Sequence, residues 1–162
     1  MNKLVVPNYE INKHYELEDD IDLSNVIFPK DSRIKQITEC HLKLSFTRFE
    51  EAFDILLTFK GKLTAVCSYT LEEFEFPFSF KERISAREDE EGDYRITNNN
   101  IDLVSICVAL IDNHVPLNVT KPGASRPSGG EGYRVLTEDE LNKERESRPD
   151  PRWAALDDIE LD

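Results

Sequence analysis

Hydrophobic and polar positions alternate along the middle of the chain. From Ile37 onward, three stretches place an apolar side chain at every second position, and the third stretch follows Gly61. Their apolar positions are Leu42, Leu44 and Phe46; Phe53, Ile55, Leu57 and Phe59; and Leu63, Ala65 and Cys67. This period of two predicts a sheet with one buried face. A glycine inside the pattern predicts a bulge, a bend or a tight turn.

The run Glu-Phe-Glu-Phe-Pro-Phe-Ser-Phe, residues 73–80, continues the alternation with four rings on one face. We expect these rings in the core, where full burial of each stabilises the fold by about 1.5–3 kcal/mol. Pro77 falls on the opposite face and lacks an N–H group. It therefore places this strand at an edge of the sheet or at a bulge.

The sequences on either side of the sheet pattern are less regular. Residues 1–18 suggest one or two short strands, and residues 22–30 are compatible with a helical turn that ends at Pro29. Residues 86–100 are rich in acids and predict an exposed loop or hairpin tip, whose last residues, Asn98 to Asn100, can cap a helix. The helical period then begins, with apolar positions at Leu103, Ile106, Cys107, Leu110 and Ile111. It predicts a packed helix over about 102–113, before Pro116.

The C-terminal part changes composition. Residues 121–132 are rich in Gly, Pro and Ser and predict a linker. Thr137 and Glu140 form a capping-box pattern, which predicts a short charged helix to about Arg145. A second short helix is expected from Asp150, as N-cap, and Pro151. The candidate partner-binding residues of this segment are Asp150, Pro151, Arg152, Trp153 and Leu156.

Trp153 and Leu156 share a face of that last helix, and two interpretations of the tryptophan remain open. It docks on the sheet and completes the core, or it anchors a partner. The predicted organisation is thus a β-rich core domain over residues 1–120, a linker over 121–132 and an acidic helical tail over 133–162. The fold class is α+β: a curved antiparallel sheet or partly open β-barrel, one packed amphipathic helix and short C-terminal helices.

Sequence motifs for catalysis are missing. The chain has no G-x-G-x-x-G, P-loop, G-x-S-x-G or H-E-x-x-H pattern, so we expect no enzyme, no catalytic residue and no cofactor. Its three cysteines and three histidines are scattered without the spacing of metal ligands, so no metal site is expected. No cation lies next to Cys67 in sequence, and nothing local predicts a lowered pKa for its thiol.

The net charge of −13 is the main global property of the chain. Such a protein repels polyanions and attracts basic partners at long range, although the charge could also serve solubility alone. Residues 131–162 contain eleven acids and five bases, an excess of six negative charges. No run of eighteen apolar residues and no signal-peptide pattern is present, which predicts a cytoplasmic protein without a membrane partner.

Four segments follow one another along the chain: the stretch with Gly61, Cys67 and Leu71, the strand with Pro77, the helix from Ile101 to Pro116, and the ending Asp-Pro-Arg-Trp-Ala-Ala-Leu at 150–156. Taken together and in this order, they resemble the YceD family, also called DUF177. The chain departs from the family pattern at Tyr69 and Thr70, where the family often has arginine and a second cysteine. Further cysteines that many members carry are also missing from residues 119–133, so a zinc role is not transferred.

The resemblance implies a non-enzymatic factor in biogenesis of the large ribosomal subunit, which supports accumulation of 23S rRNA. In that family the gene commonly lies beside that of a small, basic, zinc-ribbon protein of the large subunit. A basic ribosomal protein is therefore the first expected partner, and its recognition would use the negative charge. The oligomeric state stays open.

Two alternatives remain open. One is direct binding of large-subunit rRNA or its precursor, which needs basic residues on one face of the sheet. The two candidate sets are Lys30, Arg33, Lys35, Lys43 and Arg48, or Lys60, Lys62, Lys81 and Arg83. The other is an unrelated enzyme or small-molecule carrier, for which a deep apolar pocket would be required.

Overall fold

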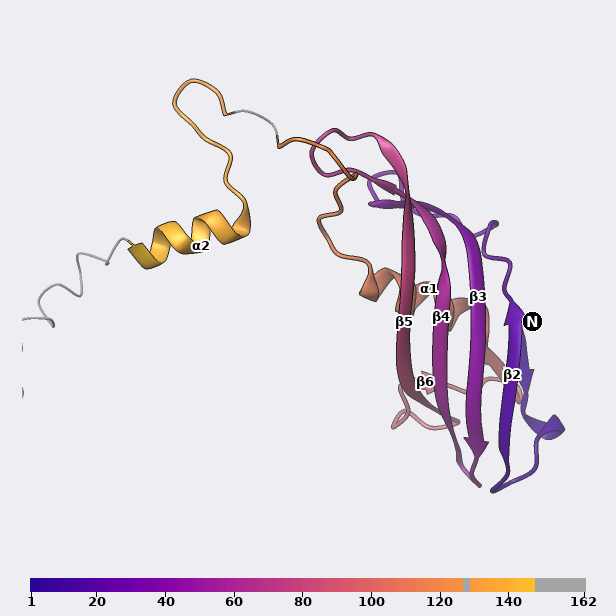
Figure 1. The fold of residues 1–162 in the computed structure, drawn as a ribbon. Coiled ribbons are helices and arrows are strands. Elements are labelled where there is room, and N and C mark those ends of the chain that lie inside the picture. The colour runs from indigo at the N-terminus through magenta and orange to yellow at the C-terminus, as the bar shows by residue number, and fades with distance from the viewer. Residues whose placement is uncertain (127–128, 148–162) are drawn as a thin grey trace, which may run out of the picture. The chain divides into compact units, whose positions relative to one another are not determined.

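A five-stranded sheet is the main element of this α+β protein, seen in a computed structural model that describes residues 1–126 and 129–147 (Figure 1). The strands are β2 (His14–Asp20), β3 (Ile34–Arg48), β4 (Ala52–Val66), β5 (Glu73–Arg87) and β6 (Tyr94–Arg95), in that spatial order. The pairs from β2 to β5 are antiparallel, and β5 pairs with β6 in parallel. The predicted antiparallel sheet is therefore confirmed, with one parallel addition at its end.

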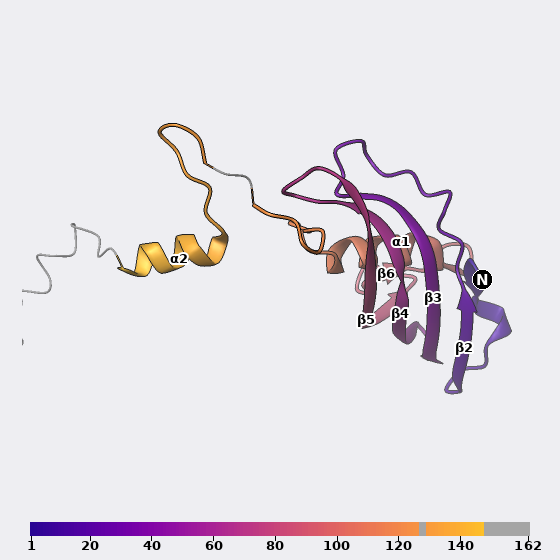
Figure 2. The same cartoon turned by 45° about the horizontal axis from the view of Figure 1, so that its top comes forward.

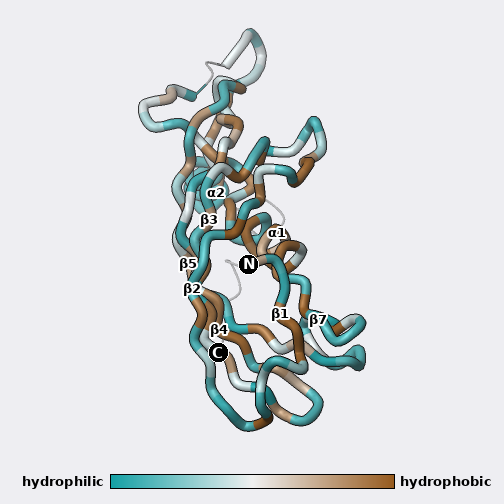
Figure 3. Tube along the Cα trace, turned by 90° about the vertical axis from the view of Figure 1, so that its right-hand side faces the viewer, coloured by the Kyte–Doolittle hydropathy of each residue, from teal (hydrophilic) through white to brown (hydrophobic). Residues whose placement is uncertain are grey.

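A second layer lies against one face of this sheet, as the edge-on view in Figure 3 shows. It contains a two-stranded sheet of β1 (Lys3–Val5) and β7 (Asn100–Asp102), and helix α1 (Leu103–His114). A short 3-10 helix (Val6–Asn8) follows β1. In Figure 2, α1 crosses behind β3, β4 and β5. We call the sheet face that is turned toward α1 the inner face and the opposite face the outer face.

The core fills the space between the two layers, and the predicted alternation explains it. The alternating apolar positions predicted in β3 and β4 are buried, together with all five predicted apolar positions of α1. Of the four rings in residues 73–80 only Phe78 is fully buried. Phe74, Phe76 and Phe80 are partly buried and pack against the same core, because they lie near the free edge of β5.

The structure corrects two local predictions. Residues 22–30 contain no helix, and a turn is formed around Ser24 instead. The N-cap of α1 is Asp102 and not Asn98 to Asn100, because its carboxylate accepts hydrogen bonds from the N–H groups of Val104 and Ser105 at 3.0 and 3.2 Å. Asp102 was hidden from the sequence pattern because it also ends β7.

The sheet is open, so of the two predicted forms the described residues adopt the curved sheet and do not close into a barrel. β2 pairs only with β3, and β5 has a second neighbour only at Ala86 and Arg87. Pro77 pairs with Lys62 of β4 on one side and lies on the free edge on the other. The prediction that Pro77 marks an edge strand is confirmed, since a residue without an N–H group costs no ladder bond there.

The chain divides into two units, residues 1–124 and 125–162. In the second unit, α2 (Glu138–Ser147) has the predicted capping box: Thr137 N–H donates to Glu140 Oε2 at 2.9 Å, and Glu140 N–H donates to Thr137 Oγ1 at 3.2 Å. All ten residues of α2 are polar or charged except Leu141. No helix in the described part of the chain is long and apolar enough to cross a membrane.

Candidate functional site

Two acidic segments meet at the end of the sheet where β3 turns into β4. Register pairing places Ala52, at the start of β4, opposite Arg87, at the end of β5. The guanidinium of Arg87 donates twice to Asp89, at 2.8 Å each, and also lies 3.4 Å from Glu51 and 3.8 Å from Glu91. The sheet register thus gathers the β3–β4 turn and the β5–β6 loop around one cation.

We call this cluster the acidic end, and it consists of seven exposed carboxylates: Glu50, Glu51, Glu88, Asp89, Glu90, Glu91 and Asp93. The Arg87 guanidinium holds the pKa of Asp89 below its usual range, and hydrogen bonds from Ser85 do the same for Asp93. The ring of Phe49 is 46% exposed and lines a shallow depression with Glu50, Glu51 and Glu88. No group of three carboxylate, histidine or cysteine ligands in the described residues could hold a metal ion.

The outer face of the sheet carries the second set of candidate residues. Four of the predicted basic residues, Lys60, Lys62, Lys81 and Arg83, lie on this face together with Lys43, as their cross-strand register shows. Arg83 forms two hydrogen bonds to Asp54, at 2.9 and 2.7 Å, and Lys62 lies 3.4 Å from Glu75. Lys43, Lys60 and Lys81 are exposed and form no ion pair with any described residue.

The other predicted basic set is not gathered. Arg33 donates to the carbonyl groups of Asp112, Val115 and Pro116 at the C-terminal end of α1. Arg48 donates to the carbonyl groups of Val6 and Tyr9 at 3.1 and 2.6 Å. Both guanidinium groups hold the second layer on the sheet, so their role is structural.

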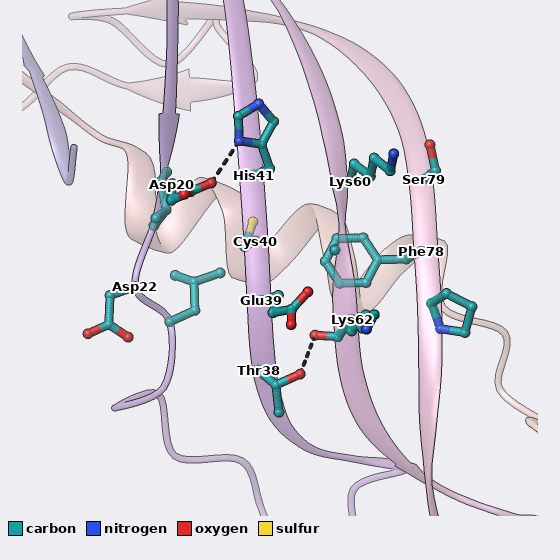
Figure 4. A pocket seen from close by; sticks show the side chains of 14 residues that line it. Asp20, Asp22, Thr38, Glu39, Cys40, His41, Lys60, Lys62, Phe78 and Ser79 are labelled. Carbon is teal, nitrogen blue, oxygen red and sulfur yellow. Dashed lines mark hydrogen bonds and ion pairs between the residues drawn. The ribbon is translucent and has the colours of Figure 1, made fainter.

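An open depression of about 850 Å³ lies where the sheet bends, lined by outer-face residues and by the core residues Cys40 and Phe78 (Figure 4). His41 lines it, with Nδ1 2.7 Å from Asp20 and Nε2 2.7 Å from Glu18. These two hydrogen bonds raise the pKa of His41. Figure 4 shows His41, Lys60 and Ser79 in a row across β3, β4 and β5, with Asp20 on the far side of the histidine.

The family-motif residues lie along the C-terminal part of β4, beside it on β5, and in the turn that follows it. Gly61 and Pro77 lie at the bend, where Gly61 pairs with Phe78 and the next residue, Lys62, pairs with Pro77. β3 has two register shifts opposite this part of β4, so the predicted bulge lies on the neighbouring strand. A Cβ atom on Gly61 would lie 2.0 Å from the carbonyl oxygen of Glu39, which explains the glycine by close approach of two backbones.

Cys67 and Leu71 lie beyond the bend, in a tight turn after the C-terminal end of β4. Leu71 N–H donates to the Cys67 carbonyl at 2.9 Å, and Leu71 has a positive φ of 60°. The Cys67 sulfur is buried and accepts a hydrogen bond from Lys121 N–H at 3.3 Å. Hydrogen bonds from the Thr70 hydroxyl and then from backbone N–H groups lower the pKa of Cys67 to about 7.

The expectation that nothing local lowers this pKa was therefore wrong. The donors are Thr70, in the turn itself, and Lys121, 54 residues further along the chain. Sequence adjacency was the wrong criterion, because a turn folds its N–H groups back onto the preceding side chain. The sulfur has no exposed surface, so what the arrangement provides is a hydrogen-bond acceptor that joins the turn to residue 121.

The remaining sequence-based candidates, Asp150, Pro151, Arg152, Trp153 and Leu156, lie outside the described residues. Sequence reasoning missed the joining of Glu50 and Glu51 to the acidic loop at 88–93. The signal was available in principle: counting back along the two predicted strands from the phenylalanine run would have placed the two segments at the same end. A scan against protein-family models found no match, and neither did searches of curated proteins and solved structures.

Proposed function

We propose that this protein is a non-enzymatic, cytoplasmic factor in biogenesis of the large ribosomal subunit, which supports 23S rRNA accumulation by holding a basic ribosomal protein. The acidic end is the observation that carries the proposal. The resemblance of Gly61, Cys67, Leu71 and Pro77 to the YceD pattern supplies the ribosomal setting. A group of exposed carboxylates suits a diffuse cationic surface better than it suits a small substrate.

The charge of the acidic end acts at two stages of binding. At long range it steers a cationic protein toward this end and raises the association rate, an effect that salt screens. At contact, each exposed ion pair contributes about 0.2–1 kcal/mol, so several pairs together give useful affinity. The exposed ring of Phe49 adds an apolar anchor among the carboxylates.

Such a surface has a clear use for a ribosomal protein. Basic ribosomal proteins carry clustered lysine and arginine that are neutralised by phosphate only after assembly. A surface with seven carboxylates offers the same neutralisation before assembly and releases the protein to rRNA, whose charge density is higher. We therefore expect a complex of moderate affinity that weakens as salt is added.

The direct experiment measures binding of the small, basic zinc-ribbon protein of the large subunit to the full chain. The test variant is Glu50→Gln/Glu88→Gln/Glu90→Gln, which removes three carboxylates that form no ion pair with a described residue. The control variant, Glu16→Gln/Asp31→Asn/Glu73→Gln, removes the same charge elsewhere. At about 0.5 kcal/mol per pair the test variant should bind roughly tenfold more weakly, with the control within about twofold.

Equal weakening by both triple variants would contradict recognition at the acidic end, because it would show a response to net charge alone. Binding no tighter than to a peptide of scrambled acidic sequence would contradict specific recognition. In cells, deletion of the gene should reduce free and assembled large subunits in ribosome profiles. A normal profile would contradict the ribosomal role itself.

A further inference from the structure

The outer face of the sheet holds lysines that the proposed protein complex does not use. Lys43, Lys60 and Lys81 come from three adjacent strands and lie away from the acidic end. We infer that this face is a second binding surface, which takes the phosphate groups of a single-stranded nucleic acid on these three lysines. The inference goes beyond the proposed function, since it assigns a second partner to a different face.

The register fixes how the three lysines are arranged. Lys43 and Lys81 flank Thr58 in one cross-strand row, and Lys60 lies in the next row, beside Ser79. With strands about 4.8 Å apart and alternate residues about 6.7 Å apart, the Cα atoms of the three lysines form a triangle roughly 8–10 Å on a side. Their flexible side chains can therefore converge on one phosphate or contact successive phosphates of a strand.

The ammonium groups of these three lysines are available to a ligand, because they form no ion pair within the described residues. The neighbouring cations are occupied within the fold, since Arg83 binds Asp54 and Lys62 lies against Glu75. The ammonium groups of the three lysines have no carboxylate partner among the described residues. Ammonium groups act as point-charge phosphate ligands, whereas planar carboxylates are best recognised by a guanidinium, and the one on this face is already in use.

Three acids of the outer face lie in the cross-strand rows of these lysines or in the next row toward the bend, and His41 holds two of them, while the third, Glu39, is exposed beside Lys62. Glu18 pairs with Lys43 in the register, but its Oε1 lies 2.7 Å from His41 Nε2. Asp20 is bound to the other ring nitrogen of His41 at the same distance. His41 thus neutralises part of the charge that would otherwise repel a phosphate approaching Lys43 and Lys60. Thr58 and Ser79 add hydroxyl donors between the cations.

The composition of this face also limits the kind of recognition. The cross-strand rows around Lys60 contain no Phe, Tyr or Trp ring, and the imidazole of His41 is held by Asp20 and Glu18, so this part of the sheet offers no free ring for base stacking. Contacts to phosphate position a nucleic acid without reading its sequence. The inferred site therefore binds a nucleic acid backbone with little sequence preference and with a marked dependence on salt.

The test uses the full chain and a fluorescently labelled single-stranded RNA of about 20 nucleotides, with binding followed by anisotropy over a range of salt. The variant Lys43→Gln/Lys60→Gln/Lys81→Gln should lose at least tenfold in affinity at low salt. Its salt slope should fall by about 2, at roughly 0.7 for each phosphate contact to a single strand. The control Lys3→Gln/Lys30→Gln/Lys35→Gln has the same net charge and should stay within about twofold.

Two competitors define the ligand. Displacement by single-stranded DNA of the same sequence supports a site for phosphates alone. Displacement by polyglutamate at equal charge concentration would overturn the phosphate assignment in favour of an acidic peptide. Absence of measurable RNA binding at low salt, or equal weakening by both lysine variants, would overturn the site itself.

The outcome of the RNA-binding test is independent of whether the proposed function is correct. The acidic-end variant Glu50→Gln/Glu88→Gln/Glu90→Gln should bind RNA at least as well as the unaltered protein, because it loses negative charge at a different surface. Conversely, the lysine variant should retain the basic ribosomal protein. A loss of both partners in one variant would contradict the assignment of two separate surfaces.

Discussion

The ring of Phe78 lies where a side chain at Gly61 would have to be. The two residues pair across β4 and β5, and a Cβ atom on Gly61 would lie 2.7 Å from Phe78 Cζ. On the other side it would lie 2.0 Å from the carbonyl oxygen of Glu39. The glycine thus allows β3 and the Phe78 ring to close over β4 at the bend of the sheet, where Gly61 and Phe78 both line the open depression.

The first prediction concerns Gly61→Ala. An added methyl cannot be accommodated by rotating Phe78 alone, because the closer contact is with backbone. We expect a loss of roughly 1–3 kcal/mol in the free energy of unfolding, measured by urea denaturation. Lys62→Ala, on the next residue of β4, is the control and should change stability by less than about 1 kcal/mol. Unchanged stability in Gly61→Ala would show that the two strands separate easily at the bend.

A second prediction concerns Arg33, whose guanidinium joins the start of β3 to the end of α1. It donates to three carbonyl groups and lies 3.2 Å from Asp112 Oδ1, with its side chain 20% exposed. Arg33→Ala should destabilise the fold by about 1.5–3 kcal/mol, since hydrogen bonds from a charged donor are lost. The stability of Arg33→Lys should lie between that of the unaltered protein and that of Arg33→Ala. A single ammonium group lacks the planar, forked set of N–H donors that lets the guanidinium reach all three carbonyl groups.

The control for Arg33 is Arg83→Ala, which removes a guanidinium of the outer face. Arg83 also pairs with a carboxylate, but its side chain is 72% exposed, so the loss should be at most about 1 kcal/mol. Hydrogen exchange provides a second measurement: Arg33→Ala should speed exchange in the last turn of α1, and Arg83→Ala should not. Similar effects of the two variants would mean that Arg33 acts only through its charge and does not stabilise the C-terminal end of α1.

The sheet and α1 could be predicted from the sequence because their signals are local and periodic. The alternation of Leu42, Leu44 and Phe46 with polar residues is enough to predict a buried sheet face. The pair Thr137 and Glu140 is likewise enough to predict the start of a helix. The bend of the sheet, the helix cap and the contacts of the half-buried arginines could not be predicted in this way, because they depend on segments that are far apart in the sequence. Arg33 and Arg48 looked like members of a basic surface, and only the path of the chain shows that carbonyl groups 79 or 39 residues away occupy them.

The candidate site was predictable in its composition and not in its position. The sequence showed the acids of residues 88–93 and the four basic residues from Lys60 to Arg83 as separate runs. Which runs meet depends on strand register, and register depends on turn lengths and on the two shifts in β3. The hydrogen-bond donors around Cys67 failed to appear for the same reason, as one of them, Lys121, follows α1 in the chain.

The third prediction concerns the thiol of Cys67. The Thr70 hydroxyl is the largest cause of its lowered pKa, so Thr70→Val should raise that pKa from about 7 toward the ordinary 9. The ionisation of the Cys67 thiol can be followed in reducing buffer by the ultraviolet absorbance of the thiolate. Thr97→Val, at an exposed threonine in the loop before β7, is the control and should leave the titration unchanged.

The same shift has a consequence for stability. A folded pKa below the unfolded one means that the unfolded chain binds more protons between pH 7 and 9. Cys67 therefore stabilises the fold fully above about pH 9, and this contribution is lost as pH falls through 7. The difference in unfolding free energy between the unaltered protein and Cys67→Ala should grow from pH 7 to pH 9. A difference that stays constant over this range would mean that Cys67 titrates alike in both states.

The last prediction concerns His41, which two carboxylates hold on the outer face. Its pKa is raised by hydrogen bonds, the largest with Asp20 and the next with Glu18. Asp20→Asn should therefore lower the pKa of His41 more than Glu18→Gln does, and ring proton shifts in NMR titrations report both. The charged groups that face this histidine from its own and the neighbouring strands are Glu18, Asp19, Asp20, Glu39, Lys43 and Lys60.

The sign of the stability effect is opposite to that of Cys67. A histidine whose folded pKa lies above the unfolded 6.5 stabilises the fold fully below pH 6.5, and the contribution disappears as pH rises through the folded pKa. His41→Gln should thus lower stability relative to the unaltered protein at pH 5.5 and have a smaller effect at pH 8.5. A larger loss at the higher pH would show that the imidazole acts as a neutral hydrogen-bonding group and not as the cation between Asp20 and Glu18.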